Sequence, residues 1–240
     1  MIREPHKVTL LALNLHRLES KSYVRNSVNI SKMSDRELHD ALLNALDNNL
    51  RAYGFVLNKR KGTFRRKNKE GWHDFQLVFL SRSPGWEVKI GLLIRKNIVE
   101  EIYHKASFFE PKYHKETPTI GVALENYISD GHDYKFTLEK IADISHCYSE
   151  ILNLFTDIAE PFFVLYNSLE KLDKAINVEQ GCSIFTGIKF EGNVGVIIAK
   201  LVGNPKYEQL KNKYRKYYEK LSNGFYLSEY EGVLRVLEEL

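Results

Sequence analysis

The fold is decided by residues 72–95, which read WHDFQLVFLSRSPGWEVKIGLLIR. Both halves of this stretch have a period of two, with Phe75, Leu77 and Phe79 on one face of the first half and Val88, Ile90, Leu92 and Ile94 on one face of the second. Alternation with a period of two is typical of a β-strand that packs one face on the core. The Ser83-Pro84-Gly85 turn between the halves is too short for a parallel crossover, so we predict an antiparallel hairpin.

Further strands are predicted on both sides of this hairpin, at 55–57 and 63–66 before it and at 119–125 and 134–138 after it. Each is short; the segment at 63–66 lies between two turns, and the others are apolar at alternate positions. A short helix is predicted at 97–106, between the hairpin and the later strands. These connections favour antiparallel pairing of neighbouring strands.

Helices are predicted on either side of the strands. Ser34-Asp35-Arg36-Glu37 is a capping box, and it opens a helix that ends at Gly54. The second half has helical periodicity, with a break or a new start at Pro161. The later predicted helices cover 169–178, 194–202 and 206–221, and a last one is opened by a capping box at 228–231. The glycines within 187–195 are interpreted as a flexible turn before a helix.

The order of elements predicts the fold class. A helix, a run of strands and then a run of helices indicate an α+β fold, an antiparallel sheet of about four to six strands packed by helices, with a helical C-terminal part. We expect an N-terminal arm at 1–32, an α+β domain at 33–180 and a helical extension at 181–240 packed on it. The arm has two interpretations: a natural flexible segment, or an upstream extension of a chain that starts at Met33.

The charge is unevenly distributed. The chain has a net charge of +4, but residues 1–120 hold 22 basic and 13 acidic side chains, and residues 121–240 hold 13 basic and 18 acidic ones. Residues 1–32 alone account for 6 basic and 2 acidic side chains, so residues 33–240 are neutral overall. The total charge therefore does not predict a nucleic-acid partner.

A local basic run is the strongest feature. Seven of the eleven residues from Lys59 to Lys69 are basic, and aromatic residues lie among and after them. A hairpin with this composition could contact phosphates and stack bases, or it could bind an acidic protein partner, or it could be a solvated edge. The candidate interaction patch comprises Lys59, Arg60, Lys61, Phe64, Arg65, Arg66, Lys67, Lys69 and Trp72.

Signatures of chemistry are weak. Glu100 and His104 are four residues apart on a predicted helix and could face one ion, but the spacing is more typical of a surface pair. Cys147 lies on an apolar helix stripe, where a buried structural thiol is expected. We therefore predict no metal, no cofactor and no catalytic residue. The longest apolar runs, such as 194–202, are shorter than the roughly 20 residues that span a bilayer, so no membrane partner is expected.

One family resemblance follows from these residues. Residues 50–55, LRAYGF, precede the basic TFRR at 63–66, the strand at 75–81 and VKIG at 88–91. This order resembles the bacterial family called domain of unknown function 4304, over about residues 34–165. The resemblance implies a cytosolic bacterial α+β domain, and it assigns no reaction to any residue.

These observations predict a non-catalytic cytosolic protein-interaction domain, in the class of immunity or defence-associated proteins. The first alternative is a nucleic-acid-binding protein that uses the basic hairpin at 59–69. The second is an enzyme whose site is assembled in space from dispersed residues such as Glu100, His104, Asp133 and His146.

Overall fold

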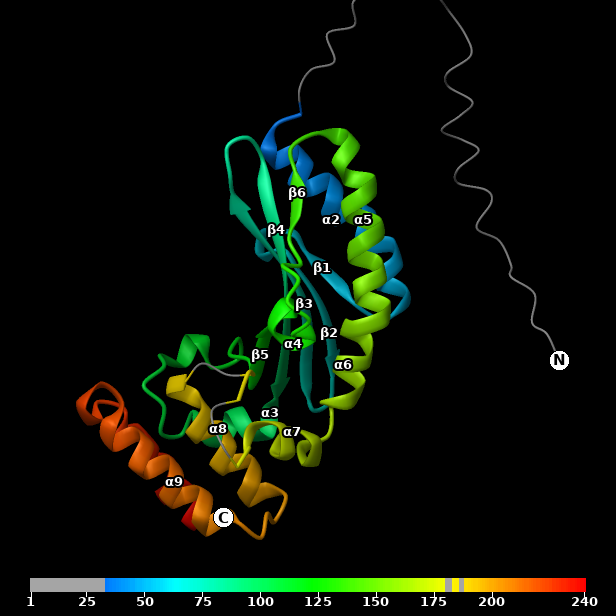
Figure 1. The fold of residues 1–240 in the computed structure, drawn as a ribbon. Coiled ribbons are helices and arrows are strands. Elements are labelled where there is room, and N and C mark those ends of the chain that lie inside the picture. Colours follow the sequence, from blue (N-terminus) through cyan, green and yellow to red (C-terminus); the bar gives the residue numbers. More distant parts are fainter. Residues whose placement is uncertain (1–32, 180–182, 186–187) are drawn as a thin grey trace, which may run out of the picture. The chain divides into compact units, whose positions relative to one another are not determined.

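An antiparallel sheet forms the centre of the fold, as the alternating pattern predicts. The structure, a computed structural model, describes residues 33–179, 183–185 and 188–240. Within them six strands pair in the order β1-β2-β3-β4-β5, and β6 also pairs with β4 (Figure 1). The strands are β1 Val56–Asn58, β2 Thr63–Asn68, β3 Gly71–Ser81, β4 Trp86–Lys96, β5 Ile120–Ala123 and β6 Phe136–Leu138.

The predicted hairpin is the longest pairing in this sheet. Strands β3 and β4 are in register from Gly71 opposite Lys96 to Ser81 opposite Trp86. The opposite edge of β4 is shared, since β6 pairs with 86–88 and β5 with 91–94. The strand predicted at 119–125 is shorter than expected, because a helical turn begins at Leu124.

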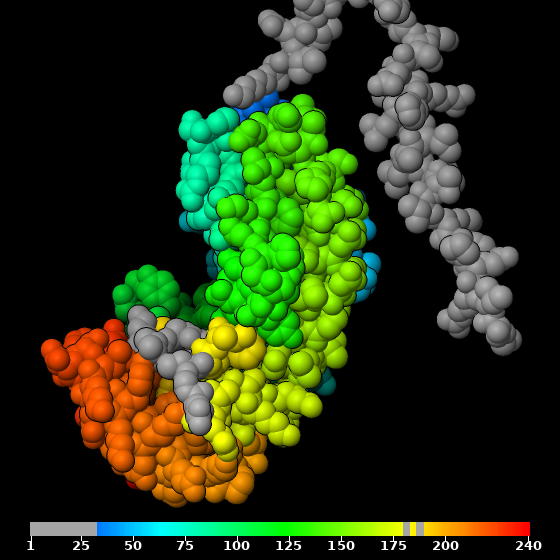
Figure 2. Space-filling view, in the orientation of Figure 1, coloured from blue at the N-terminus to red at the C-terminus, as the bar shows by residue number. Residues whose placement is uncertain are grey.

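Most helices fall before or after the strands, and only the short α-helices that follow β4 and β5 lie between strands of the described chain, which confirms the α+β class. Their bounds are α2 Asp35–Ala52, α3 Asn97–Tyr103, α4 Leu124–Ile128, α5 Ile141–Leu154, α6 Glu160–Leu165, α7 Leu169–Ile176, α8 Ile188–Leu201, α9 Tyr207–Lys220 and α10 Leu227–Glu238. On the face drawn in Figure 2, α5 and the C-terminal helices form much of the surface.

The first helix begins and ends where the sequence predicts. The Ser34 hydroxyl accepts from the Glu37 amide at 3.3 Å, and the Glu37 carboxylate accepts from the Ser34 amide at 2.8 Å. These bonds satisfy two of the amides that a helix start leaves without partners. Gly54, which follows the helix, has φ +81°, a conformation that glycine adopts without a steric penalty.

One face of the sheet packs against α2, α5 and the segment after α5. A π-helical turn at Phe155–Ala159 links α5 to α6, and Pro161 lies in the first turn of α6. The ring of Phe155 contacts Phe75 of β3 at 5.2 Å between centroids, and Phe55 at 5.4 Å. The fully buried aromatic side chains Phe55, Phe75 and Phe155 thus join the sheet to the helices.

The C-terminal helices pack beside α3. Helix α8 begins at Ile188, so the flexible turn predicted around 187–195 is wrong for the described part of that segment. A Cβ at Gly192 would lie 2.6 Å from the Tyr218 ring, and one at Gly195 would lie 2.8 Å from the Tyr214 hydroxyl. The glycines are therefore packing positions, at which the tyrosines of α9 approach the backbone of α8.

The second predicted capping box is also wrong. Helix α10 begins at Leu227, so Ser228 lies inside it, and no side chain caps its start. The Glu229 carboxylate is buried instead, and it accepts hydrogen bonds from the Phe108 amide at 2.8 Å and the Tyr103 hydroxyl at 3.1 Å. Glu231, the glutamate that the capping box would use, accepts a hydrogen bond from Arg215 of α9 at 2.6 Å instead.

Residues Met33–Leu240 form one unit. The predictions made for residues 1–32, including the start at Met33, lie outside the described residues. In the described part of the chain, no helix combines the length and apolar character needed to cross a membrane.

Candidate functional site

The basic run forms the β1–β2 connection and the β2 strand. Residues 59–61 make a short 3-10 turn, and β2 begins at Thr63. Successive side chains of a strand point to opposite faces of the sheet. Phe64 and Arg66 consequently point to the side of the helices, whereas Arg65 and Lys67 point to the other side. The predicted patch is therefore divided between two faces.

The two aromatic residues of the patch are not exposed. Phe64 is fully buried and contacts the ring of Phe75, so its place in an accessible patch is corrected. Trp72 is 5 % exposed, and the Arg65 guanidinium lies 3.9 Å from its ring centroid. The alternation of β2 and β3 explains both results, because Phe64 faces the core and Trp72 stands beside Arg65 on the opposite face.

Arg65 is held by acidic groups of the same chain. It makes a two-pronged pair with Asp74, with Nε–Oδ1 at 2.7 Å and Nη2–Oδ2 at 2.8 Å. Its Nη1 donates to Glu116 at 3.3 Å, and Lys61 donates to the same carboxylate oxygen at 2.7 Å. The hydrogen bonds to Asp74 raise the pKa of Arg65. Arg65 and Lys61 thus already have acidic partners in the same chain.

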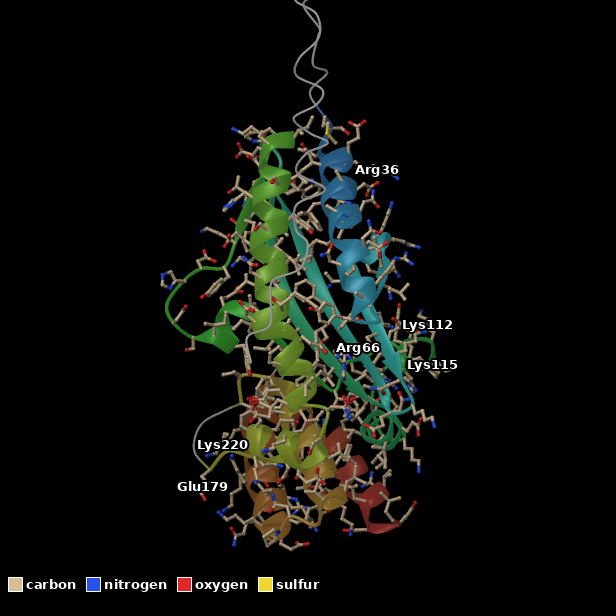
Figure 3. The ribbon with its side chains drawn as sticks, turned by 90° about the vertical axis from the view of Figure 1, so that its right-hand side faces the viewer. Arg36, Arg66, Lys112, Lys115, Glu179 and Lys220 are labelled. Atoms are coloured by element: carbon tan, nitrogen blue, oxygen red, sulfur yellow. The ribbon has the colours of Figure 1, made fainter. Side chains whose placement is uncertain are left out.

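Arg66 is held on the other face. Its Nη1 donates to Glu160 of α6 at 2.8 Å, and its guanidinium lies 4.7 Å from the Phe55 ring centroid. Its Nη2 lies 3.3 Å from Nδ1 of His73, and burial together with Arg66 and Lys96 lowers the pKa of His73 to about 4. Figure 3 shows Arg66 over the body of the unit, between strand and helix.

The remaining cations of the run behave differently. Lys59, Arg60, Lys67 and Lys69 are exposed, and none of them has an ion-pair partner among the residues that the structure describes. These four side chains are the part of the predicted patch that a partner could reach.

A loop after α3 covers the outer face at this end of the sheet. Arg95 of β4 donates to the Thr117 carbonyl at 2.7 Å, and the Trp72 indole donates to the Lys115 carbonyl at 3.4 Å. Glu116, between them, receives Lys61 and Arg65. Hydrogen bonds thus attach the loop to three strands, and Lys115 of the loop lies beside the hairpin.

A hollow of about 610 Å³ lies between the β2–β3 turn, α3 and this loop. Its cationic and imidazole side chains are Lys67, Arg95, His104, Lys105, His114 and Lys115, and Glu101 is the acidic side chain in its lining. Lys67, Lys105 and Lys115 are exposed, and each is without an ion-pair partner within residues 33–179, 183–185 and 188–240. We call this feature the cationic hollow.

The dispersed enzyme site that we considered forms only in part. Glu100 and His104 do meet, with Nε2–Oε2 at 3.5 Å, but both side chains are buried, so the expected surface pair is corrected. Asp133 instead pairs with Lys89 and Lys135, and His146 is exposed on α5. Among the described residues, no group of three or more His, Cys, Asp or Glu side chains is arranged to hold a metal ion.

Thr117 fills the space between Glu100 and His104. Its Oγ1 lies 2.6 Å from Glu100 Oε2, 2.7 Å from His104 Nε2 and 3.0 Å from Arg95 Nη1. A hydroxyl donates one hydrogen bond and accepts two, so these contacts use its full capacity. This arrangement fits a structural junction better than a reacting nucleophile.

Cys147 is fully buried, as predicted for a structural thiol, and burial raises its pKa to about 11. A thiolate is therefore strongly disfavoured at neutral pH. Cys182 lies outside the described residues.

Sequence reasoning did not find Arg95, Lys105, Lys115 and Thr117. None of them belongs to the basic run at 59–69. Arg95 lies in β4, and the other three reach the hairpin through a loop whose path no local pattern indicates. The Glu100–His104 spacing was the signal nearest to this site.

The chain matches no family model, no curated protein and no solved structure. The resemblance to domain of unknown function 4304 therefore stays a prediction.

Proposed function

We propose that this chain is a non-catalytic, cytosolic interaction domain that binds an acidic segment of a partner protein in the cationic hollow. The observation that carries the proposal is the gathering, around a concave surface, of lysines that have no ion-pair partner among the described residues. Lys67 comes from β2, Lys105 follows α3, and Lys115 lies in the loop. Positive groups that converge from β2 and from both ends of the loop between α3 and β5 favour the docking of an acidic segment by charge complementarity.

The framework of the hollow is fixed by internal contacts. Trp72 and Arg95 form its floor from adjacent strands, opposite each other in the register, and both are nearly buried. The loop on the other side is held by hydrogen bonds to these two residues. A surface that is already ordered avoids part of the ordering cost of binding.

The described surface favours an acidic protein segment over a nucleic acid. Single-stranded nucleic acids bind through cationic grooves together with aromatic rings on which the bases stack. Phe64 is buried and Arg65 covers Trp72, so the hairpin offers charge without a stacking platform. The carboxylate side chains of an acidic segment can bind to the positive charges without an aromatic ring on which to stack.

The test compares two charge reversals of equal size. One variant carries Lys67→Glu, Lys105→Glu and Lys115→Glu, and the control carries Lys171→Glu, Lys216→Glu and Lys220→Glu. All six lysines are exposed, so both variants change the net charge equally. Figure 3 shows Lys115 and Lys220 at opposite margins of the view. The probe is a fluorescein-labelled ten-residue peptide of alternating glutamate and serine, measured by fluorescence polarisation.

We expect the hollow variant to lose about tenfold or more in peptide affinity, and the control to lose much less. Equal losses in both variants, or no peptide binding by the unmodified chain at low ionic strength, would overturn the proposal. A ten-nucleotide single-stranded RNA serves as the second probe. Tighter RNA binding that the hollow variant abolishes would replace the protein partner with a nucleic acid.

The wider assignment is part of the same proposal. Membership in the bacterial family of domain of unknown function 4304, and a role among immunity or defence-associated proteins, rest on the sequence resemblance and on the binding surface. Neither assigns a chemical role to a residue. The acidic-peptide experiment tests the binding surface on its own.

A further inference from the structure

A second concave feature lies on the far side of Glu100 from the cationic hollow. It is a cavity of about 190 Å³, with Glu100 and Tyr103 of α3, Thr117, Thr119 and Phe109 in its wall. The remaining described lining is apolar and comes from β5 and from residues in and before α8. Glu100 is 1 % exposed, so a carboxylate stands in the wall of a largely apolar cavity.

The polar part of this wall presents acceptors. The Thr117 hydroxyl donates to Glu100 Oε2 at 2.6 Å, and the Thr119 hydroxyl donates to Oε1 at 2.9 Å. The Tyr103 hydroxyl donates to Glu229 at 3.1 Å, and burial raises its pKa, so it keeps its proton. All three hydroxyl protons are committed to carboxylates. A ligand that bonds to this wall must therefore bring its own donors.

The charge of Glu100 is only partly balanced. The nearest guanidinium atom is Arg95 Nη1, at 3.7 Å from Oε2, and the imidazole Nε2 of His104 lies at 3.5 Å. Arg95 directs its shorter hydrogen bonds to Thr117 and Asn97. Oε1 lies on the other branch of the carboxylate and receives Thr119. A buried carboxylate is stabilised by a hydrogen-bonded cation, and Oε1 has capacity for one.

Aromatic side chains line the same cavity as this carboxylate. The ring centroids of Tyr103 and Phe109 are 6.4 Å apart, and Phe190 lies 5.7 Å from Phe109 and 6.4 Å from Tyr103. Aromatic faces attract cations, and the attraction is strongest where water is excluded. The cavity therefore combines two elements that recognise an organic cation.

We propose that this cavity binds a small organic ammonium ion, with the ammonium group on Glu100 and the apolar body against Tyr103 and Phe109. The size is suitable, because a cavity of roughly 150 Å³ can hold benzene. The site is separate from the cationic hollow in both charge and ligand, and it does not depend on the function proposed there.

The test uses isothermal titration calorimetry with 2-phenylethylammonium as the probe and 2-phenylethanol as its neutral counterpart. Methylammonium and isobutylammonium extend the series to smaller bodies. We expect at least one ammonium ion to bind, and 2-phenylethylammonium to bind about tenfold or more tightly than the alcohol. Glu100→Gln should remove this preference, since it keeps the shape and deletes the charge.

Two further variants make the result specific. Glu101→Gln changes the next residue, which faces the cationic hollow, and should leave ammonium binding unchanged. Val194→Phe fills the cavity from α8 without altering its polar wall, and should abolish binding even if Glu100→Gln fails to fold. Thermal unfolding confirms that each variant is folded.

The proposal is overturned if no ammonium ion of the series binds at millimolar concentration. Equal affinity for 2-phenylethanol, binding that survives Val194→Phe, or an equal loss in Glu101→Gln would overturn it as well. The lysine reversals of the cationic hollow should not change ammonium binding, which keeps the two sites distinguishable.

Discussion

The arginines of the basic hairpin and the lysines of the cationic hollow differ in what they contact. Arg65 and Arg66 each bind a carboxylate and lie over an aromatic ring of the same chain. Lys67, Lys105 and Lys115 are exposed and without ion-pair partners across the described residues. A guanidinium matches a carboxylate with two hydrogen bonds and also stacks on rings, whereas an ammonium is a strongly hydrated point charge.

The difference shows that a run of basic residues is not one site. Part of the charge in residues 59–69 fastens the hairpin to β3, α6 and the 114–118 loop. Lys67 of the same run lies instead with Lys105 and Lys115 around the hollow. The following predictions separate a structural role from a binding role.

The largest effect is expected at the pair of Arg65 and Asp74. Asp74 is 2 % exposed, so Asp74→Asn leaves the guanidinium without its buried counter-charge. Breaking a buried ion pair from one side costs about 3 kcal/mol or more. Urea unfolding measures this loss, with Glu116→Gln as the control, because Glu116 is about half exposed and its pairs are worth much less. A loss below about 1 kcal/mol in Asp74→Asn would contradict a structural role for Arg65.

The second effect is a loss of stability in acid that depends on His73. Its pKa is about 4 in the folded protein and about 6.5 when exposed, because burial, Arg66 and Lys96 oppose its charged form. The unfolded chain therefore takes up a proton first as the pH falls. Stability is present in full above pH 6.5 and is lost progressively down to about pH 4, with about 2 kcal/mol of this loss between pH 7 and pH 5.

The measurement is the free energy of unfolding at pH 7 and at pH 5, for the unmodified chain and for His73→Phe. Phenylalanine keeps a flat ring against Phe163, on which His73 stacks at 5.1 Å, but it cannot titrate. The variant should therefore lose less stability than the unmodified chain between these two pH values. Equal losses would assign the effect to carboxylates elsewhere.

The sheet could be predicted from the sequence because the side chains of a strand alternate between its two faces, and this period of two is visible in the sequence. The alternation in residues 72–95 gave the hairpin, and the Ser34 capping box gave the start of α2. The same alternation, applied to β2, would have placed Phe64 on the core side and Arg65 on the other. The division of the basic patch between two faces could thus be predicted in part from the sequence.

Other features leave no such record. The glycines Gly192 and Gly195 have the same appearance in a sequence whether they form a turn or admit the tyrosines of α9. Glu231 fits a local capping box, yet its carboxylate accepts hydrogen bonds from Arg215 of the preceding helix α9. The hollow depends on the path of the loop from 104 to 118. Contacts with residues distant in the sequence determine this path.

A smaller effect is expected from the ion pair between Arg66 and Glu160. Both side chains are about one fifth exposed, so solvent weakens their attraction more than it does at Asp74. A double-mutant cycle with Arg66→Met and Glu160→Gln should give a coupling energy of about 1 kcal/mol. A coupling energy as large as the stability loss in Asp74→Asn would contradict this difference in solvent exposure, because the ion pair of Arg66 would then be as strong as that of Arg65.

The smallest effect on stability is expected at the lysines of the hollow. Changing Lys67, Lys105 and Lys115 together to alanine removes no ion pair, so the free energy of unfolding should change by about 0.5 kcal/mol or less per site. The sign can be favourable, because three positive side chains around one hollow repel one another. Salt distinguishes this case: screening should stabilise the unmodified chain slightly more than the triple variant. Urea unfolding at low and at high salt measures both quantities. A loss of stability comparable to that of Asp74→Asn would show that the lysines hold the loop in place. The proposed function rests on the distinction between arginines that stabilise the fold and lysines that bind a partner, and this result would remove it.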